Sequence, residues 1–184
     1  PSEDIEAPAI LLRDQAGEIL AGLGFSEIIT YSFISPDSAD RLGAGKESPI
    51  RSFVTLQNPL TTEQSVMRTS LVPGLLETVK ENIYHGETDL KMFEWGNIFI
   101  ARDPDSLPLE RLFLSAIMTG RYHRDGLHSE ARQVDFYDMK GAVEVLLRSL
   151  GLSRTEFKRH TPEPWYHPGF SCRIYAVSYT HLTL

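Results

Sequence analysis

The chain has 184 residues and a mass of 20.8 kDa, enough for one sizeable hydrophobic core, so we expect a single domain. Its 18 basic and 25 acidic side chains give a formal net charge of −7, which repels phosphate backbones and disfavours a free-standing nucleic-acid binder. Cys172 is the only cysteine, which excludes an internal disulfide and a multi-cysteine zinc site.

Membrane insertion and secretion are also disfavoured by the sequence. No apolar run approaches the roughly 20 residues that a membrane-spanning helix needs. The first residues, PSEDIE, are acidic and lack a basic and then apolar secretory pattern. We therefore expect a cytoplasmic protein that makes no contact with a membrane.

Hydrophobic periodicity predicts the elements of the first half of the chain. A helix is expected over residues 8–22, and the apolar residues of one helix face are Leu12, Ala16, Ile19, Leu20 and Leu23. Residues 25–34 are rich in β-branched and aromatic side chains and predict a buried strand. A short helix over 35–42 and a short strand over 53–56 follow. A second long helix is expected after the cap residue Ser70, with an inward stripe of Leu71, Leu75, Val79 and Ile83.

The second half predicts a long strand pair and a further helix. Residues 90–101 form the strongest strand pattern, and 112–118 is its expected antiparallel partner. A polar loop is expected over 121–133. Asp135 then caps a helix that Gly151 ends, and strands follow over 157–160 and 171–176. Together these elements predict an α+β fold, a mostly antiparallel sheet flanked by helices.

Several segments, in order along the chain, resemble the class II aminoacyl-tRNA synthetases. The helix at 8–22 followed by LGFSE resembles motif 1, the dimer-interface helix and strand of that fold. Arg68-Thr69 and the strand at 93–103 resemble the motif 2 region. The segment DFYDMKG from Asp135 to Gly141 resembles a helix start of phenylalanyl-tRNA synthetases. With GFSEIITYSF, LQNPL, MRTSLVPGLL, FEWGNIF and WYHPG, the whole run is most similar to the catalytic-like domain of the bacterial-type phenylalanyl-tRNA synthetase β subunit.

The resemblance implies a domain with the class II fold that is not itself catalytic. It places Ile100 where a working motif 2 carries the arginine that binds the ATP α-phosphate, and isoleucine offers no charged donor. Arg102 is a conceivable substitute, but a surface arginine is the favoured interpretation. The arginine-bearing motif 3 is missing as well, so adenylation is expected to fail. We therefore predict no catalytic, cofactor-binding or metal-binding residue in this domain.

The same resemblance implies partners. The family assembles as α2β2, in which the α subunit activates phenylalanine with ATP and magnesium and the β subunit supports it and helps to bind tRNA(Phe). We expect the face formed by Leu12, Ala16, Ile19 and Leu20 to lie at or under an α-subunit interface. An ordinary core stripe is the alternative interpretation of these four residues.

Two alternatives of another class stay open at this point. The chain could be a free-standing ATP-dependent amino-acid-activating enzyme, or an RNA-binding module that uses cations such as Lys158 and Arg159. A zinc site at His123 and His128 is disfavoured, because their spacing crosses a glycine and fits no single helix face. We expect residues 1–176 to form the class II-like domain. Residues 177–184 depart from the family pattern and are expected to be a non-native or truncated tail.

Overall fold

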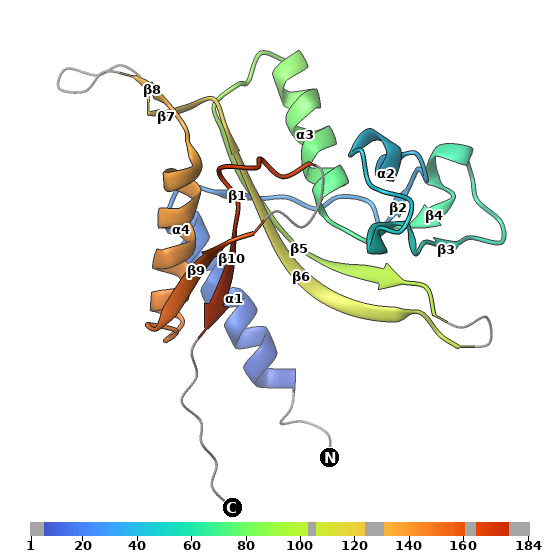
Figure 1. Cartoon of the computed structure of the whole chain (residues 1–184), viewed down its shortest axis with the longest axis horizontal. Helices are drawn as coiled ribbons and strands as arrows, with labels where there is room; N and C mark the ends of the chain where they lie inside the picture. The colour runs from blue at the N-terminus through green and yellow to red at the C-terminus, as the bar shows by residue number, and fades with distance from the viewer. Residues whose placement is uncertain (1–5, 103–105, 124–130, 161–164, 177–184) are drawn as a thin grey trace, which may run out of the picture.

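The computed structural model describes residues 6–102, 106–123, 131–160 and 165–176 (Figure 1). The described residues form helices and strands in both halves of the chain. In order they are α1 (Glu6–Gly22), β1 (Ser26–Glu27), β2 (Phe33–Ile34), α2 (Ser38–Arg41), η1 (Pro49–Arg51), β3 (Val54–Thr55), η2 (Thr62–Gln64), β4 (Val66–Met67), α3 (Val72–Tyr84), β5 (Leu90–Ile100), β6 (Leu109–Thr119), β7 (Arg121–His123), β8 (Arg132–Gln133), α4 (Phe136–Ser149), β9 (Thr155–Arg159) and β10 (Cys172–Ala176).

The central sheet has the strand order β1-β5-β6. Strands β5 and β6 pair antiparallel along their whole length, from Leu90 opposite Thr119 to Ile100 opposite Leu109, which confirms the predicted pair. Strand β1 runs parallel to β5. The sheets β2-β4-β3, β7-β8 and β9-β10 are antiparallel, so the predicted α+β class with mostly antiparallel pairing is confirmed.

Helices cover both faces of the central sheet. Helices α1 and α4 lie side by side against one face (Figure 1). Helix α3 contacts β5 and β6 on the other face, where Leu71 lies beside Gly96. The buried residues of the first layer are Ala16, Leu20, Phe25, Phe93, Ala142 and Leu146. Successive side chains of a strand point to opposite faces, so the neighbours of Phe93 in β5 that face away from this core are Met92 and Glu94. The polar cluster described below lies on that second face.

Helix α4 begins as the sequence predicts, whereas the N-cap residue of α3 is Leu71 and not the expected Ser70. The Oγ of Ser70 accepts a hydrogen bond from the backbone N–H of Val72 at 3.2 Å. Asp135 and Asp138 form a reciprocal capping box at the start of α4. The inward stripe of α3 is confirmed for Leu71, Leu75 and Val79 but is wrong for Ile83, which lies in the last turn of the helix and is 46% exposed.

The prediction of one buried strand over 25–34 is wrong. The chain pairs with β5 only over β1, then leaves the central sheet and joins β4 as β2. Between them, the backbone N–H of Thr30 donates to the carboxylate of Glu94 instead of to a strand. The Glu94 side chain thus replaces the backbone acceptor that a neighbouring strand would provide. Ile29 and Tyr31, on either side of Thr30, are 90% and 78% exposed. The loop expected over 121–133 also contains a short hairpin, β7-β8.

Candidate functional site

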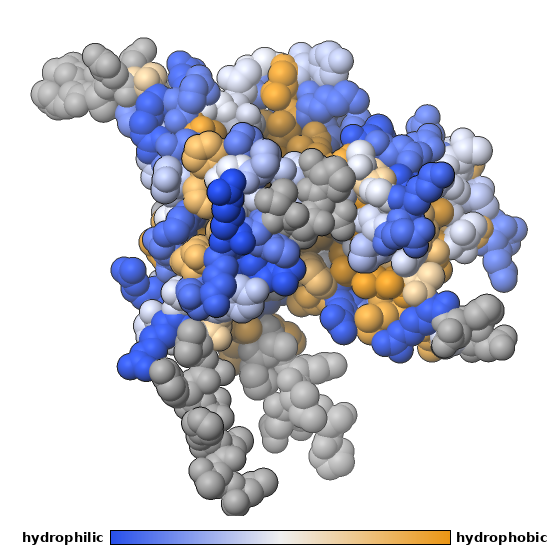
Figure 2. Space-filling model, in the orientation of Figure 1, coloured by the Kyte–Doolittle hydropathy of each residue, from blue (hydrophilic) through white to orange (hydrophobic). Residues whose placement is uncertain are grey.

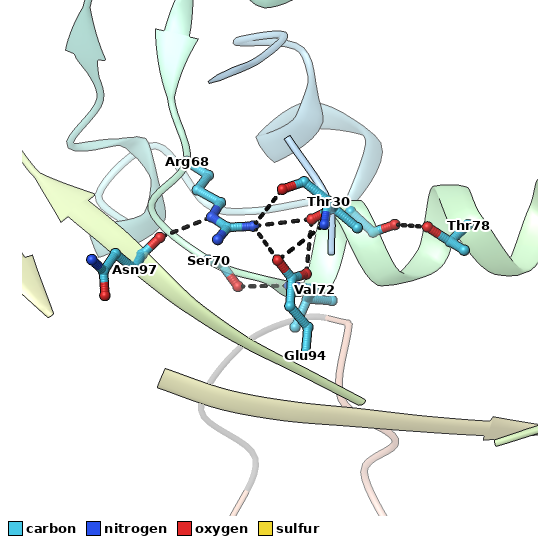
Figure 3. A network of polar contacts seen from close by, with 8 residues as sticks. Thr30, Arg68, Ser70, Val72, Thr78, Glu94 and Asn97 are labelled. Carbon is cyan, nitrogen blue, oxygen red and sulfur yellow. Dashed lines mark hydrogen bonds and ion pairs between the residues drawn. The ribbon is translucent and has the colours of Figure 1, made fainter. Parts of the chain in front are cut away.

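A buried ion pair lies on the second face of β5, in the region that resembles motif 2 (Figure 3). Arg68 follows β4 and is 5% exposed, and Glu94 in β5 is 1% exposed. The Nη1 of Arg68 donates to the Oε1 of Glu94 at 2.6 Å. The Nε of Arg68 donates to the backbone carbonyl of Asn97 at 2.8 Å. The guanidinium is therefore oriented by two separate positions of the same strand.

Thr30 completes this polar cluster from the segment between β1 and β2. Its hydroxyl donates to Oε2 of Glu94 at 2.8 Å and accepts from Nη1 of Arg68 at 3.0 Å. Its backbone N–H donates to Oε1 of Glu94 at 3.2 Å, and its carbonyl accepts from Arg68 at 3.4 Å. Figure 3 shows the three side chains converging from three separate segments of the chain. Burying two charges is costly unless they are paired and hydrogen-bonded, and both conditions are met here.

Two glycines make room for the polar cluster. A Cβ at Gly96 in β5 would lie 2.1 Å from Nη2 of Arg68 and 2.9 Å from a methyl carbon of Leu71. A Cβ at Gly74 in the first turn of α3 would lie 2.5 Å from the hydroxyl oxygen of Thr30. Each distance is far below van der Waals contact, so the cluster and the α3 packing both depend on glycine at these positions.

The second face of β5 also carries position 100, because residues 94, 96, 98 and 100 of the strand point to the same side. Arg68 is occupied by Glu94 and the backbone, and Ile100 provides no cation at the position that the resemblance assigns to the phosphate-binding arginine. Ile100 is the last residue of β5, is half-buried and lies opposite Leu109. Two clefts of about 510 and 680 Å³ are lined by other residues, such as Lys91 and Tyr122 in the first and Phe33 and Leu76 in the second.

Arg102 is exposed and lies beyond the end of β5, which agrees with its interpretation as a surface residue. The sequence singled out the Arg68-Thr69 start of the motif but did not predict the pairing of Arg68 with Glu94. An isolated glutamate amid the apolar residues Met92, Phe93 and Trp95 was a usable signal. A carboxylate in the middle of a buried strand requires a cation or several hydrogen-bond donors.

The predicted interface residues of α1 divide into two groups. Ala16 and Leu20 are 1% and 3% exposed, and Ile19 packs against the same core. Leu12 is 49% exposed and lies next to Ile10 and Leu11, which are 54% and 67% exposed. The core-stripe interpretation therefore fits Ala16 and Leu20 in this chain. The α-subunit interface stays a prediction. Of the four residues, Leu12 has the side chain exposed enough to contact another subunit.

The segment that resembles a phenylalanyl-tRNA synthetase helix start is held by an ion pair. Arg132 in β8 donates to both carboxylate oxygens of Asp138, at 2.7 and 2.5 Å. These hydrogen bonds, followed by that from the backbone N–H of Asp135, lower the pKa of Asp138 to about 2. Asp138 thus fixes the start of α4 and its link to the β7-β8 hairpin. Its contacts are those of a structural residue.

The other residues that the sequence singled out are a pair of histidines and two cations of β9. His128 lies outside the described residues, and in the part of the chain that the structure describes no group of three or more His, Cys, Asp and Glu side chains could hold a metal ion. Lys158 pairs with Glu156 at 3.2 Å and Arg159 donates to the carbonyl of Pro168, as expected of a solvated sheet face. Among the described helices, none is long and apolar enough to cross a bilayer.

The fold is that of the class II aminoacyl-tRNA synthetases. Two solved structures of pyrrolysyl-tRNA synthetase from Desulfitobacterium hafniense superpose with TM-scores of 0.60 and 0.61. Each superposition covers 83% of this chain, and 49% and 50% of the pyrrolysyl chains. Sequence identity is only 16% and 17%, so the similarity establishes the fold and leaves the activity open.

The sequence comparisons are more specific. The model of the phenylalanyl tRNA synthetase beta chain CLM domain matches residues 2–180, and the chain belongs to this family. It is 42% identical to the phenylalanine–tRNA ligase beta subunit of Geobacter metallireducens over 89% of its length, and 42% identical to that of Syntrophus aciditrophicus over 90%. The match covers 20% of each of these relatives, so the chain spans about a fifth of their length. The resemblance drawn from the sequence motifs is thereby confirmed.

Proposed function

We propose that this domain is a non-catalytic scaffold of a phenylalanine–tRNA ligase β subunit, which supports a catalytic α subunit in attaching phenylalanine to tRNA(Phe). One observation carries the proposal: on the face of β5 that carries position 100, the chain's own Arg68 and Glu94 form a buried ion pair. Family membership and 42% identity to β subunits support the same conclusion. ATP and magnesium are then bound elsewhere in the complex.

Adenylation by the isolated chain is the first test. Exchange of pyrophosphate into ATP, measured with phenylalanine and with a mixture of all amino acids, is expected to stay at the level of the buffer. Residue 100 is an isoleucine, and Arg68, the cation of the buried pair on the second face of β5, is already bound to Glu94. Amino-acid-dependent exchange would overturn the scaffold proposal and establish the free-standing activating enzyme.

Binding of the α subunit is the second test. We propose that the exposed apolar surface of α1, formed by Ile10, Leu11 and Leu12, contacts the α subunit in an α2β2 assembly. Leu12→Asp is expected to weaken binding of the α subunit about tenfold or more, as is usual for a well-packed apolar anchor. Leu60→Asp is the matched control, because Leu60 is 94% exposed and lies far from α1 in sequence.

Ile19→Asp is less informative than Leu12→Asp, because Ile19 packs against the domain core and a charge there is expected to unfold the chain. Equal α-subunit affinity for the wild-type chain and for a folded Leu12→Asp variant would refute the interface. Tight binding of tRNA by the isolated chain at physiological salt would instead favour the RNA-binding module, which the net charge of −7 opposes.

A further inference from the structure

The segment before β10 contains WYHPG, a motif of the resemblance to which the proposed function assigns no role. Its described part runs from Trp165 to Ser171, and the side chains of Tyr166 and Phe170 are 44% and 56% exposed. In Figure 1 the segment crosses the front of the molecule from the side of α3 to the start of β10. Figure 2 shows mainly hydrophilic side chains around β10, so apolar burial contributes little on this face. Specific polar contacts therefore decide how the segment is held.

The imidazole of His167 holds the turn that follows it. Its Nδ1 accepts a hydrogen bond from the backbone N–H of Gly169 at 3.0 Å and another from the N–H of Phe170 at 3.1 Å. A neutral imidazole has one N–H and one acceptor nitrogen, so two donors at Nδ1 require the tautomer with its proton on Nε2. The turn is thus formed by the neutral side chain. Protonation of Nδ1 places an N–H donor where the turn requires an acceptor.

Two neighbouring elements are attached to this turn. The Nε and Nη2 of Arg159 in β9 donate to the carbonyl of Pro168 at 3.3 and 2.7 Å. The ring of Phe170 lies 6.1 Å from that of Phe136, the first residue of α4, and 5.0 Å from the imidazole. His167 therefore fixes a link between β9 and the start of α4.

The charged groups around the turn disfavour a protonated imidazole. Arg159 places a guanidinium at the residue next to His167, and like charges so close repel each other. The carboxylates of Asp135 and Asp138 at the start of α4 are already bound to backbone N–H groups and to Arg132. No carboxylate in the described ranges forms an ion pair with the imidazole. The other charged side chains of β9, β10 and α4 are Glu156, Lys158, Arg173, Lys140, Glu144 and Arg148.

We propose that residues 165–170 form a pH-sensitive strap between β9 and the start of α4, docked while His167 is neutral and released when its Nδ1 takes up a proton. Acidification from about pH 8 to about pH 5, the range in which histidines change charge, replaces the acceptor of the turn with a donor and adds a charge beside Arg159. Both hydrogen bonds to Nδ1 then break. The contacts of Phe170 with Phe136 and of Pro168 with Arg159 are lost with them, which uncovers Phe136 next to the capping box of α4.

The test follows the full isotope-labelled chain by NMR from about pH 8 to about pH 5. At the upper end, the ring-nitrogen chemical shifts of His167 are expected to identify Nδ1 as unprotonated. On acidification, the amide signals of Gly169 and Phe170 are expected to shift together with those of the ring. Their protection from hydrogen exchange, relative to a free peptide at the same pH, is expected to fall at least about tenfold. Asp138 does not titrate in this range, because its pKa is about 2.

Three variants assign the response to one imidazole. In His167→Asn the side-chain oxygen can accept the same two N–H bonds but does not titrate, so the docked amide signals are expected over the whole pH range. His167→Ala removes the acceptor and is expected to give the released signals throughout. His160→Gln is the matched control, because the Nε2 of His160 is buried without a partner in the described part of the chain. It is expected to leave the response of Gly169 and Phe170 unchanged.

Four results would overturn the strap. They are a proton on Nδ1 of wild-type His167 at about pH 8, equal pH responses of the wild type and His167→Asn, docked amide signals in His167→Ala, and a response that is lost in His160→Gln but kept in His167→Asn. The inference does not depend on the scaffold function, because neither pyrophosphate exchange nor binding of the α subunit enters any of these measurements.

Discussion

Removing the acidic partner of the buried ion pair is the sharpest test of the polar cluster. In Glu94→Leu, Arg68 keeps its charge but loses its 2.6 Å partner, and Thr30 loses the acceptor for two hydrogen bonds. At an effective dielectric constant of 20, the lost attraction is about 6 kcal/mol before solvation of the freed charge is counted. We expect a net loss of about 3–5 kcal/mol in the free energy of unfolding, as for other buried pairs that lose one partner.

An exposed ion pair of the same length provides the matched control. Arg51 and Asp40 also lie 2.6 Å apart, but the Asp40 side chain is 67% exposed, against 1% for Glu94. Because water screens and solvates such a pair, Asp40→Leu is expected to cost at most about 1 kcal/mol. Distance alone therefore does not set the energy, and the difference between the two variants measures the effect of burial.

Urea unfolding is the appropriate assay, followed by circular dichroism and by the fluorescence of Trp95, the half-buried neighbour of Glu94. The double variant Arg68→Met/Glu94→Leu removes both charges and is expected to recover a large part of the loss, since an apolar pair of similar volume avoids the unpaired charge. Losses in Glu94→Leu and Asp40→Leu that agree within about 1 kcal/mol would refute the reasoning.

Three further predictions follow from the same contacts. Gly96→Ala is expected to lower the free energy of unfolding by about 1–3 kcal/mol through its clash with Arg68, and by less in an Arg68→Met background. Asp138 has a lowered pKa of about 2, so the stability that its charge contributes is present above its unfolded pKa and is lost as the pH falls from about 4 towards 2. In Asp138→Asn, the urea concentration at the unfolding midpoint is therefore expected to change less with pH over that range than in the wild type. Ile100→Arg is expected to leave pyrophosphate exchange absent, since Arg68 stays paired and the face stays filled.

Each of these outcomes can fail in a recognisable way. An unchanged unfolding midpoint in Gly96→Ala would mean that Arg68 moves aside at no cost. An equal acid response of wild type and Asp138→Asn would assign the acid sensitivity to other carboxylates. Amino-acid-dependent exchange in Ile100→Arg would show that one arginine suffices for adenylation even though Arg68 is paired with Glu94.

The elements with long, regular patterns were predicted from the sequence. The α3 stripe from Leu71 to Val79, the cap at Asp135 and the β5-β6 pair depend on neighbours within a few residues or on one strong alternation. The segment over 25–34 was predicted wrongly because its β-branched and aromatic composition indicates an extended chain but does not specify which strand each part pairs with. Its departure from the sheet depends on Glu94, which is 64 residues away from Thr30.

The motifs of the sequence by themselves determined the family and the class II fold, and they predict the loss of the motif 2 arginine at Ile100. Those conclusions depend only on the order and identity of short segments. The tertiary structure alone decided that Arg68 is occupied by Glu94, and that Ala16 and Leu20 are core while Leu12 is exposed. The physical reason is that burial and charge pairing are properties of residues brought together from distant parts of the chain, and neither composition nor local periodicity specifies which partner a buried charge will meet.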